Sequence, residues 1–298
     1  MISLSSTPTA AVGHRPLGVI SAQGADSAKF LQGQLSANIE ALAPGSTVLA
    51  GYHNVQGRAI ALLRVSKLDH ARLLLTLPKE LVADVIARLS RYVLRAKIRL
   101  VDASDAVMVF GADRTTPINP STAASALALL DWGDARRVAL IAADQASTAL
   151  DEAPSEVAAW QAADIADGLP QIYQETSEVF VAQMLNLDAL GGIAFDKGCY
   201  TGQEVIARAH YRGRVKRRLQ RFVSQQPMPS YVIGAVGTLD DGRTFKVVDA
   251  VQRDDGRCEW LAVAALAGGT NSDDDKLEPA PNDTVAAQSL PLPYALPD

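Results

Sequence analysis

The sequence predicts an α+β protein in which helices cover one side of largely antiparallel sheets. Strand-length runs of Val, Ile and Leu alternate with helix-length segments up to about residue 212. Beyond that point short β-type runs follow one another without helices. The chain has 298 residues, of which 48% are hydrophobic, so it is long enough for two or three domains with an ample core.

The first 212 residues contain most of the predicted elements, after a loose tail over residues 1–13. Strands are expected at residues 16–20, 48–50, 60–65, 73–77, 98–101, 107–110 and 138–141. Helices are expected at residues 24–32, 78–93, 121–130 and 155–165. The second helix is the clearest, because its apolar residues recur every four positions and Pro78 suits a first helical turn.

Residues 213–298 are predicted to form a small all-β module. Asp241-Gly242 and Asp255-Gly256 separate short apolar runs and are typical turn signals. Residues 266–286 are rich in Asp, Pro, Ser, Asn and Gly, which favours an exposed loop. A last strand is expected within residues 290–296.

Composition excludes several classes of protein. The formal net charge is −5, whereas a general nucleic-acid binder usually carries a basic surplus, so RNA contact would need a local patch. Two cysteines do not make a disulfide scaffold. The N-terminus lacks the features of a signal peptide, and no apolar run approaches the ~20 residues of a membrane span. We therefore expect a cytoplasmic protein with no membrane contact.

The most informative segment is residues 195–204, FDKGCYTGQE. Thr201 and Glu204 have the spacing of a capping box, which predicts a helix that begins just after Thr201. Cys199 would then lie beside free amides at the positive end of that helix, and Lys197 adds a second positive charge. Both influences favour the thiolate, the nucleophilic form of cysteine. The alternative is a small cysteine that merely packs in a loop.

The eight residues from Lys197 to Glu204 resemble the K-G-C-Y-x-G-Q-E signature of the YgfZ-type folate-binding family. That family is related to the aminomethyltransferase, or T-protein, of the glycine cleavage system. The resemblance continues at Gln183, at residues 190–193 and at residues 207–213, and residues 30–34 resemble the F-L-Q-G segment of the aminomethyltransferases. Chance is a poor explanation for a match of eight residues.

The resemblance implies an aminomethyltransferase-like fold. Ferredoxin-like α+β subdomains would form a ring around a folate-sized opening, with a small β-barrel at the C-terminus. On this basis residues 14–212 would be the folate-binding region, with two interleaved subdomains, and residues 213–298 the barrel. The implied ligand is tetrahydrofolate or a derivative. The implied partners are iron–sulfur enzymes or cluster-assembly proteins, with tRNA-thiolating enzymes among them.

The same resemblance implies the site residues. Cys199 would be the reactive thiol, and the rest of the signature would surround it: Lys197, Gly198, Tyr200, Gly202, Gln203 and Glu204. Gln203 and Glu204 are expected to hold the turn rather than to do chemistry. Folate would be contacted by Tyr52, Asn54, Asp167 and Gln183.

Two departures from the aminomethyltransferase pattern affect the predicted activity. The acidic positions of its N-x-x-G-G-x-x-D-D-like segment fall on Ala61 and Leu62, which cannot accept a proton. We therefore expect no aminomethyltransferase activity, and we keep a folate-dependent aminomethyltransferase or other one-carbon transferase as the alternative function. A pterin-binding acid falls on Ala166; Asp164 or Asp167 could replace it, or both could simply end a helix as solvated charges.

Two further site classes were considered. Residues 211–221 form a dense basic run that could bind the glutamate tail of folate or an RNA backbone. The interpretation we favour is that these basic side chains are solvated on one side of a strand. Direct RNA binding is the alternative. The four histidines pair neither with each other nor with a cysteine at metal-site spacing, so no metal site is expected.

Overall fold

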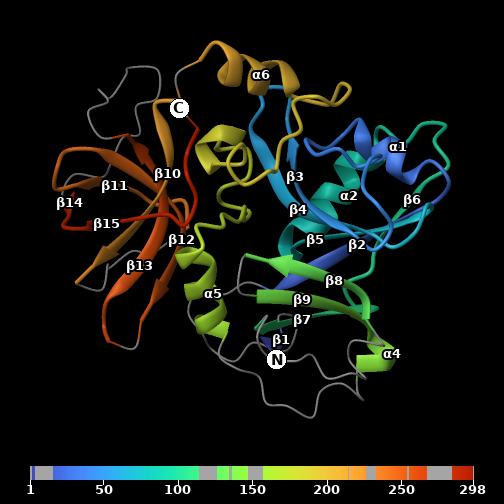
Figure 1. Cartoon of the computed structure of the whole chain (residues 1–298), viewed down its shortest axis with the longest axis horizontal. Coiled ribbons are helices and arrows are strands. Elements are labelled where there is room, and N and C mark those ends of the chain that lie inside the picture. The colour runs from blue at the N-terminus through green and yellow to red at the C-terminus, as the bar shows by residue number, and fades with distance from the viewer. Residues whose placement is uncertain are drawn as a thin grey trace.

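A computed structural model describes most of the chain, which folds into three sheets and a few short helices (Figure 1). The described residues are 2–3, 16–113, 126–133, 136–146, 157–213, 215–225, 233–253, 255–266 and 284–297. In this part of the chain no helix is long and apolar enough to cross a membrane.

The first sheet has five antiparallel strands and carries the largest core. Its order is β3 (Thr47–His53), β4 (Ala59–Lys67), β5 (Arg72–Pro78), β2 (Leu17–Gln23) and β6 (Arg99–Asp102). Helices α1 (Ser27–Gln32) and α2 (Val82–Ser90) pack on it, the latter after a 3-10 turn, η1 (Lys79–Leu81). The strands and helices predicted in this region are all found, within a few residues at each end.

The second sheet has four antiparallel strands, in the order β1 (Ile2–Ser3), β7 (Val107–Asp113), β9 (Arg136–Ala142) and β8 (Ala126–Trp132). The short helix α4 (Ala143–Ala146) follows β9, and α5 (Val157–Ala166) packs near the sheet through Trp160. The rings of Trp132 and Trp160 are 6.2 Å apart. Ile2 and Ser3 pair with β7 although they belong to the segment expected as a loose tail.

The helix predicted at residues 121–130 is wrong for its described part, which is strand β8. Burial alternates along this strand: Ala128, Leu130 and Trp132 are buried, whereas Leu127 and Leu129 are exposed. Alanine and leucine favour a helix locally, but pairing with β9 fixes the period of two. Tertiary pairing has therefore overridden local propensity.

The third sheet is curled into a half-barrel and is built entirely from the C-terminal part of the chain. Its order is β14 (Thr284–Val285), β11 (Val236–Leu239), β12 (Thr244–Gln252), β13 (Cys258–Ala265), β10 (Arg217–Ser224) and β15 (Gln288–Leu290). Trp260 forms its centre, with the rings of Phe222 and Phe245 at 4.8 and 4.6 Å.

Both predicted turns of the third sheet are confirmed. Gly242 and Gly256 have positive φ and close the β11–β12 and β12–β13 connections. The predicted loop at 266–286 includes β14, and its residues 267–283 lie outside the described part. The predicted last strand at residues 290–296 is wrong except at Leu290, because β15 ends at that residue and residues 291–297 are not in a strand.

The segments between the sheets position the site. The 3-10 turn η2 (Ala182–Leu185) and helix α6 (Gln203–Tyr211) lie between the first and third sheets (Figure 1). The C-terminal segment returns to this region, where the Tyr294 hydroxyl donates to the Gly168 carbonyl at 2.8 Å. This hydrogen bond attaches the C-terminal segment to the turn that follows α5.

Candidate functional site

Lys197 joins the signature segment to the end of α1. Its Nζ donates to the carbonyls of Gln32, Leu35 and Ala37, at 2.5, 2.5 and 3.0 Å. Burial lowers the pKa of Lys197 to about 8, against the smaller opposing effect of Glu40. Gln32 belongs to the F-L-Q-G segment, so this lysine brings together two of the sequence segments that carry the family resemblance.

Gly202 joins the same segment to the turn between β3 and β4. Its φ is +83°, and a Cβ there would lie 2.4 Å from the Asn54 carbonyl oxygen. Gly57, in that turn, has φ +71° and would bring its own Cβ within 3.1 Å of Val205. Two backbones therefore approach so closely that only glycine fits at Gly202.

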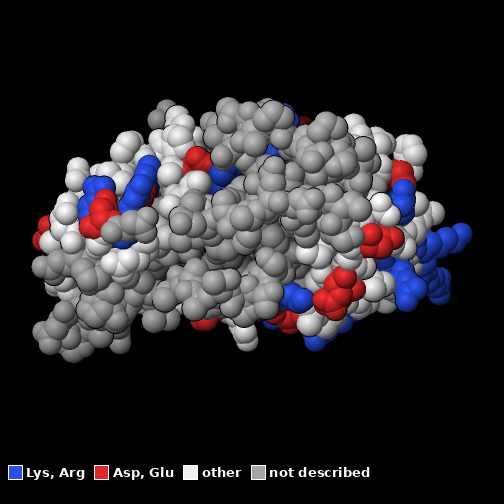
Figure 2. All heavy atoms as spheres, turned by 90° about the horizontal axis from the view of Figure 1, so that it is seen from below, with Lys and Arg blue, Asp and Glu red and all other residues white. Residues whose placement is uncertain are grey.

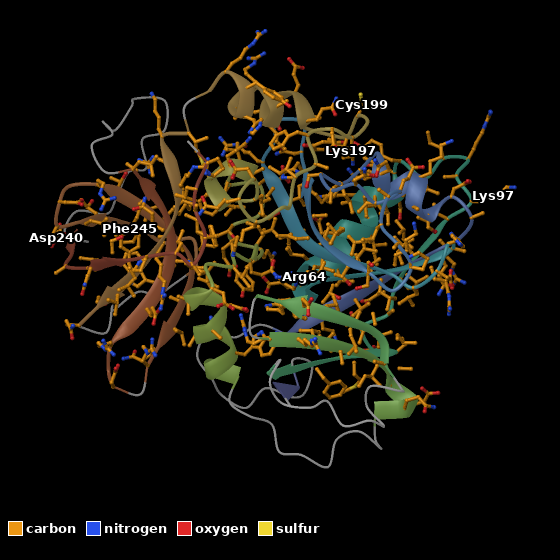
Figure 3. All side chains as sticks on the ribbon, in the orientation of Figure 1. Arg64, Lys97, Lys197, Cys199, Asp240 and Phe245 are labelled. Carbon is orange, nitrogen blue, oxygen red and sulfur yellow. The ribbon has the colours of Figure 1, made fainter. Side chains whose placement is uncertain are left out.

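Cys199 lies on the exposed loop between these two attachments (Figure 3). Its thiol is free. Two exposed valines lie on the flanking elements, Val55 on the β3–β4 turn and Val205 on α6. The loop around Cys199 is thus held on both sides while its thiol remains open to a partner. The Lys197 ammonium, which was expected to act on this thiol, is bound by the three carbonyls instead.

The predicted capping box at the start of α6 is wrong. The N-cap is Gly202 in the left-handed conformation, and no side chain of the described part of the chain caps the helix. Gln203 holds the turn instead, because its Oε1 accepts a hydrogen bond from the Tyr200 amide at 3.1 Å. Glu204 is exposed and faces Arg208 at 3.3 Å. The helix thus begins one residue later than the capping box implied.

Tyr200 is the buried member of the signature. Its ring lies 4.8 Å from the Lys197 Nζ, and burial raises its pKa to about 12. A hydroxyl with so high a pKa stays protonated at neutral pH. Tyr200 therefore contributes packing beneath the exposed loop.

Asn54 shapes the β3–β4 turn. Its Oδ1 accepts hydrogen bonds from the amides of Gln56 and Arg58, both at 3.0 Å. Its Nδ2 donates to Glu178 at 2.8 Å, and Glu178 also pairs with Arg88 at 2.7 Å. Every polar atom of the Asn54 side chain is thus committed to the protein.

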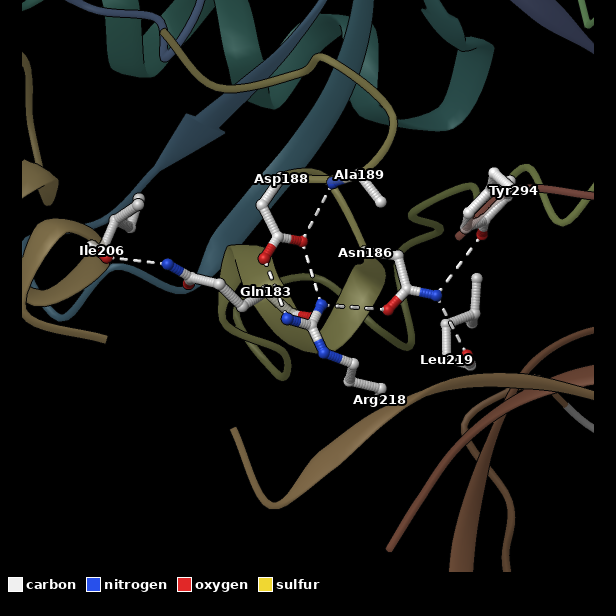
Figure 4. Close-up of polar contacts among 8 residues, drawn as sticks. All are labelled: Gln183, Asn186, Asp188, Ala189, Ile206, Arg218, Leu219 and Tyr294. Atoms are coloured by element: carbon white, nitrogen blue, oxygen red, sulfur yellow. Dashed lines mark hydrogen bonds and ion pairs between the residues drawn. The ribbon is translucent and has the colours of Figure 1, made fainter. Parts of the chain in front are cut away.

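Gln183 and Arg218 form a buried polar network between η2 and the third sheet (Figure 4). Gln183 Nε2 donates to the Ile206 carbonyl at 2.7 Å, while its Oε1 has no hydrogen-bond partner among the described residues. Arg218 binds both carboxylate oxygens of Asp188 at 2.9 Å. Asn186 donates to the Leu219 carbonyl at 3.0 Å. Gln183 therefore braces α6.

The prediction that the basic side chains of residues 211–221 are solvated is wrong for the arginines of β10. Arg217 and Arg218 are buried, at 6% and 5% exposure. Arg221 pairs with Glu259, which is buried in the sheet. The arginines of the strand point into the protein and cannot reach an RNA backbone, so the exposed charge of this run is reduced to Arg212 and Lys216 among its described residues.

Tyr52, Ala61 and Leu62 lie side by side in the first sheet and are all buried. Tyr52 pairs with Ala61 across β3 and β4, and burial raises its pKa to about 12. Leu62 lines a small cavity of about 30 Å³. The two positions that the sequence comparison predicted to replace the acids of an aminomethyltransferase are therefore apolar and buried.

Arg64 lies at the centre of the molecule and lines two adjoining cavities (Figure 3). Its guanidinium is 4.0 Å from the centroid of the Trp132 ring. Partial burial lowers its pKa to about 10, which leaves it positive at neutral pH. No hydrogen bond or ion pair from Arg64 to another described residue is formed at normal distances.

The larger of the two cavities is about 270 Å³ and opens to solvent. Residues of all three sheets, or of the segments that follow them, line it: Leu49, Arg64, Gly133, Asp167, Leu169, Leu190, Pro293 and Tyr294. Asp167 accepts a hydrogen bond from Arg136 at 2.7 Å. Of the four residues expected to contact folate, Asp167 lines this opening, whereas Tyr52, Asn54 and Gln183 do not.

Two further carboxylates face the small cavity, Asp164 and Asp249. Asp164 is bound by Trp132 and Arg136, both at 2.7 Å, so it is not the solvated helix end that the sequence allowed. Burial raises the pKa of Asp249 to about 7, although Gln161 donates to it at 2.7 Å. Arg64 and Asp249 were missed from the sequence, because each shares its strand with a second charge, Lys67 in β4 and Lys246 in β12, and no local pattern singles it out.

A solved structure shares this fold. The glycine cleavage system aminomethyltransferase T from Bartonella henselae matches with a TM-score of 0.61 and 13% identity, over 83% of this chain and 76% of that chain. The protein is therefore a mixed α+β protein with a fold like that of the glycine cleavage aminomethyltransferase T. No protein-family model matches the chain.

The curated relatives identify the family. The tRNA-modifying protein YgfZ of Klebsiella pneumoniae is 30% identical over 300 residues, which cover 92% of this chain and 90% of the relative. The tRNA-modifying protein YgfZ of Cronobacter sakazakii is 34% identical over 258 residues, which cover 78% of each chain. The chain belongs to the YgfZ family, as the signature predicted.

Proposed function

We propose that this protein binds tetrahydrofolate or a derivative and supports the assembly or repair of iron–sulfur enzymes, including enzymes that modify tRNA. In this proposal residues 14–212 form the folate-binding part of a ring of subdomains. Residues 213–298 form a barrel-like module, and the protein acts in the cytoplasm.

The opening at Arg64 is the observation that carries the folate part. Arg64 is a positive group that has no hydrogen-bond partner among the described residues, in a cavity with apolar and aromatic walls. Sites for small molecules are typically apolar clefts with a few polar groups that fix orientation. At about 270 Å³ the opening suits one end of a folate, with the remainder extending toward solvent. Asp167 lies on the same wall and is the candidate carboxylate contact.

The exposed Cys199 supports the accessory part. Its loop is attached through Lys197 on one side and Gly202 on the other, whereas the thiol itself is free and exposed. Cys199 does not line either of the two central cavities. We therefore assign Cys199 to contact with an iron–sulfur enzyme or a cluster-assembly protein rather than with folate.

The alternative function is a folate-dependent aminomethyltransferase, which the shared fold favours. Its chemistry needs an acid at the position of Ala61 or Leu62, and both are buried and apolar. Transfer of a methylene group to tetrahydrofolate by the purified protein, with an aminomethylated carrier as donor, would establish this alternative.

A cell-based assay tests the accessory function. A bacterial strain that lacks its own YgfZ-family protein is supplied with the wild-type gene, with Cys199→Ala or with Cys258→Ala. We expect wild type and Cys258→Ala to restore the activity of an iron–sulfur enzyme, because Cys258 is buried and donates to the Val251 carbonyl. We expect Cys199→Ala to fail while it accumulates to the same level. Full restoration of the enzyme activity by Cys199→Ala would show that Cys199 is not needed for contact with the partner.

A further inference from the structure

Residues 91–99 connect α2 to β6 and present a row of positive side chains. Arg91, Arg95, Lys97 and Arg99 are all exposed. The apolar residues between them, Val93, Ala96 and Ile98, are partly buried and pack against the first core. Because apolar residues point inward at these positions, the charged ones point outward together. We call residues 91–99 the basic surface.

The backbone of the basic surface is fixed in place. Asp26 Oδ2 accepts a hydrogen bond from the Lys97 amide at 2.7 Å, and the Asp26 amide donates to the Lys97 carbonyl at 3.3 Å. The Ala96 amide donates to the Val93 carbonyl at 2.7 Å. A segment that is already ordered loses little conformational entropy when it binds a partner.

The charges of the basic surface are not neutralised within the described part of the chain. None of its four cations forms an ion pair with a described residue. Arg88, one turn earlier, shows the contrast, because it pairs with both Asp84 and Glu178. Figure 2 shows Lys and Arg side chains gathered at the end of the molecule where Figure 3 places Lys97. On a chain of net charge −5 this is a local reversal of sign.

Two exposed non-polar side chains lie among these cations. Tyr92 is 52% exposed and Leu94 is 90% exposed. Leu94 also has φ +44°, a left-handed conformation that is unfavourable for a residue other than glycine. Folding alone gives no benefit from an exposed leucine in a strained conformation, which indicates a surface that meets a partner.

We propose that the basic surface binds RNA. Its arginine guanidiniums and Lys97 would contact the phosphate backbone, and Tyr92 would stack on an unpaired base. Three of its four cations are arginine, whose planar fork matches phosphate oxygens. Single-stranded RNA is typically bound by positive side chains combined with exposed aromatic rings. This inference goes beyond the proposed function, in which RNA is handled by the partner enzymes, and does not depend on folate binding.

The experiment measures fluorescence anisotropy of a labelled transfer-RNA transcript with the full-length protein between about 50 and 200 mM salt. We expect binding that weakens steeply with salt. The double variant Arg95→Gln, Lys97→Gln is expected to bind at least tenfold more weakly. Its slope of log K against log salt should fall by roughly 0.7–0.9 for each lost phosphate contact.

The matched control is Arg212→Gln, Lys216→Gln, which removes the same charge from the other exposed basic segment. We expect it to bind the transcript within twofold of wild type. Tyr92→Ala is expected to weaken binding about tenfold with an unchanged salt slope, because the variant loses stacking on a base but no phosphate contact. Equal loss in the two double variants, no binding at 50 mM salt, or binding to anionic phosphatidylserine vesicles in place of the transcript would overturn the proposal.

Discussion

A Cβ atom on Gly202 would lie 3.0 Å from the Cα of Gly57, so the start of α6 rests directly on the β3–β4 turn. This contact joins two segments that are almost 150 residues apart in the chain. It fixes one end of the loop that carries Cys199, while Lys197 fixes the other end. Most of the signature therefore holds the loop in place, and the loop in turn exposes the Cys199 thiol.

Substitution of Gly202 tests this packing. We expect Gly202→Ala to lower the free energy of unfolding by about 2 kcal/mol or more, because the positive φ and the Asn54 carbonyl both oppose a side chain. Gly198→Ala is the matched control, since a Cβ there meets no atom within 4 Å. Urea denaturation measures both. Equal effects of the two substitutions would contradict the packing argument.

The buried ion pair between Arg218 and Asp188 predicts a large loss of stability. The two side chains are 6% and 3% exposed. Asp188→Ala is expected to destabilise the protein by about 3–5 kcal/mol, because it leaves the arginine charge buried and unpaired. Glu204→Ala removes an exposed pair with Arg208 and should have little effect on stability. Thermal denaturation compares them, and a similar shift in Tm for both variants would argue that Arg218 is not buried in solution.

Asp249 predicts an unusual dependence of stability on pH. Burial raises its pKa from 3.8 to about 7, so the folded state binds this proton more tightly than the unfolded state. Between these two pKa values the folded chain holds more protons, and the free energy of unfolding falls as the pH rises. The loss is complete above the folded pKa.

Asp249→Asn keeps the acceptor for Gln161 and removes the titration. At about pH 8 its free energy of unfolding should exceed that of wild type by about 2–4 kcal/mol, and the difference should vanish near pH 4. Urea denaturation at both pH values measures this. The exposed Asp255, whose pKa is lowered by hydrogen bonds from Arg257, is the control, and Asp255→Asn should show no gain at pH 8. A pH-independent difference for Asp249→Asn would show that folding does not shift the pKa of this carboxyl.

Much of the fold could be predicted from local patterns. The strands of the first sheet, α2 and α5 have apolar spacing that matches the core they bury. Strand β8 could not be predicted in this way, because its alternation in burial comes from pairing with β9 rather than from its Ala- and Leu-rich composition. The capping box failed for a related reason. Packing of Gly202 on Asn54 sets the start of α6, and a contact between residues so far apart in the chain cannot be predicted from the local sequence.

The site was predicted only in part. The signature led to the family, but not to the exposed position of Cys199. It did not reveal that Lys197 binds the carbonyls after α1, nor that the arginines of β10 are buried, since both depend on contacts distant in sequence. Arg64 and Asp249 converge on adjoining cavities from different sheets, which no spacing rule could show.

Calorimetric titration of tetrahydrofolate into the purified protein tests the central claim most directly. We predict that wild type and Cys199→Ala bind alike, since Cys199 lies outside the two central cavities. Arg64→Ala should bind at least tenfold more weakly, whereas Arg257→Ala, at an exposed ion pair in the β12–β13 turn, should match wild type. No heat of binding with wild type, or full affinity in Arg64→Ala, would contradict the folate site proposed here.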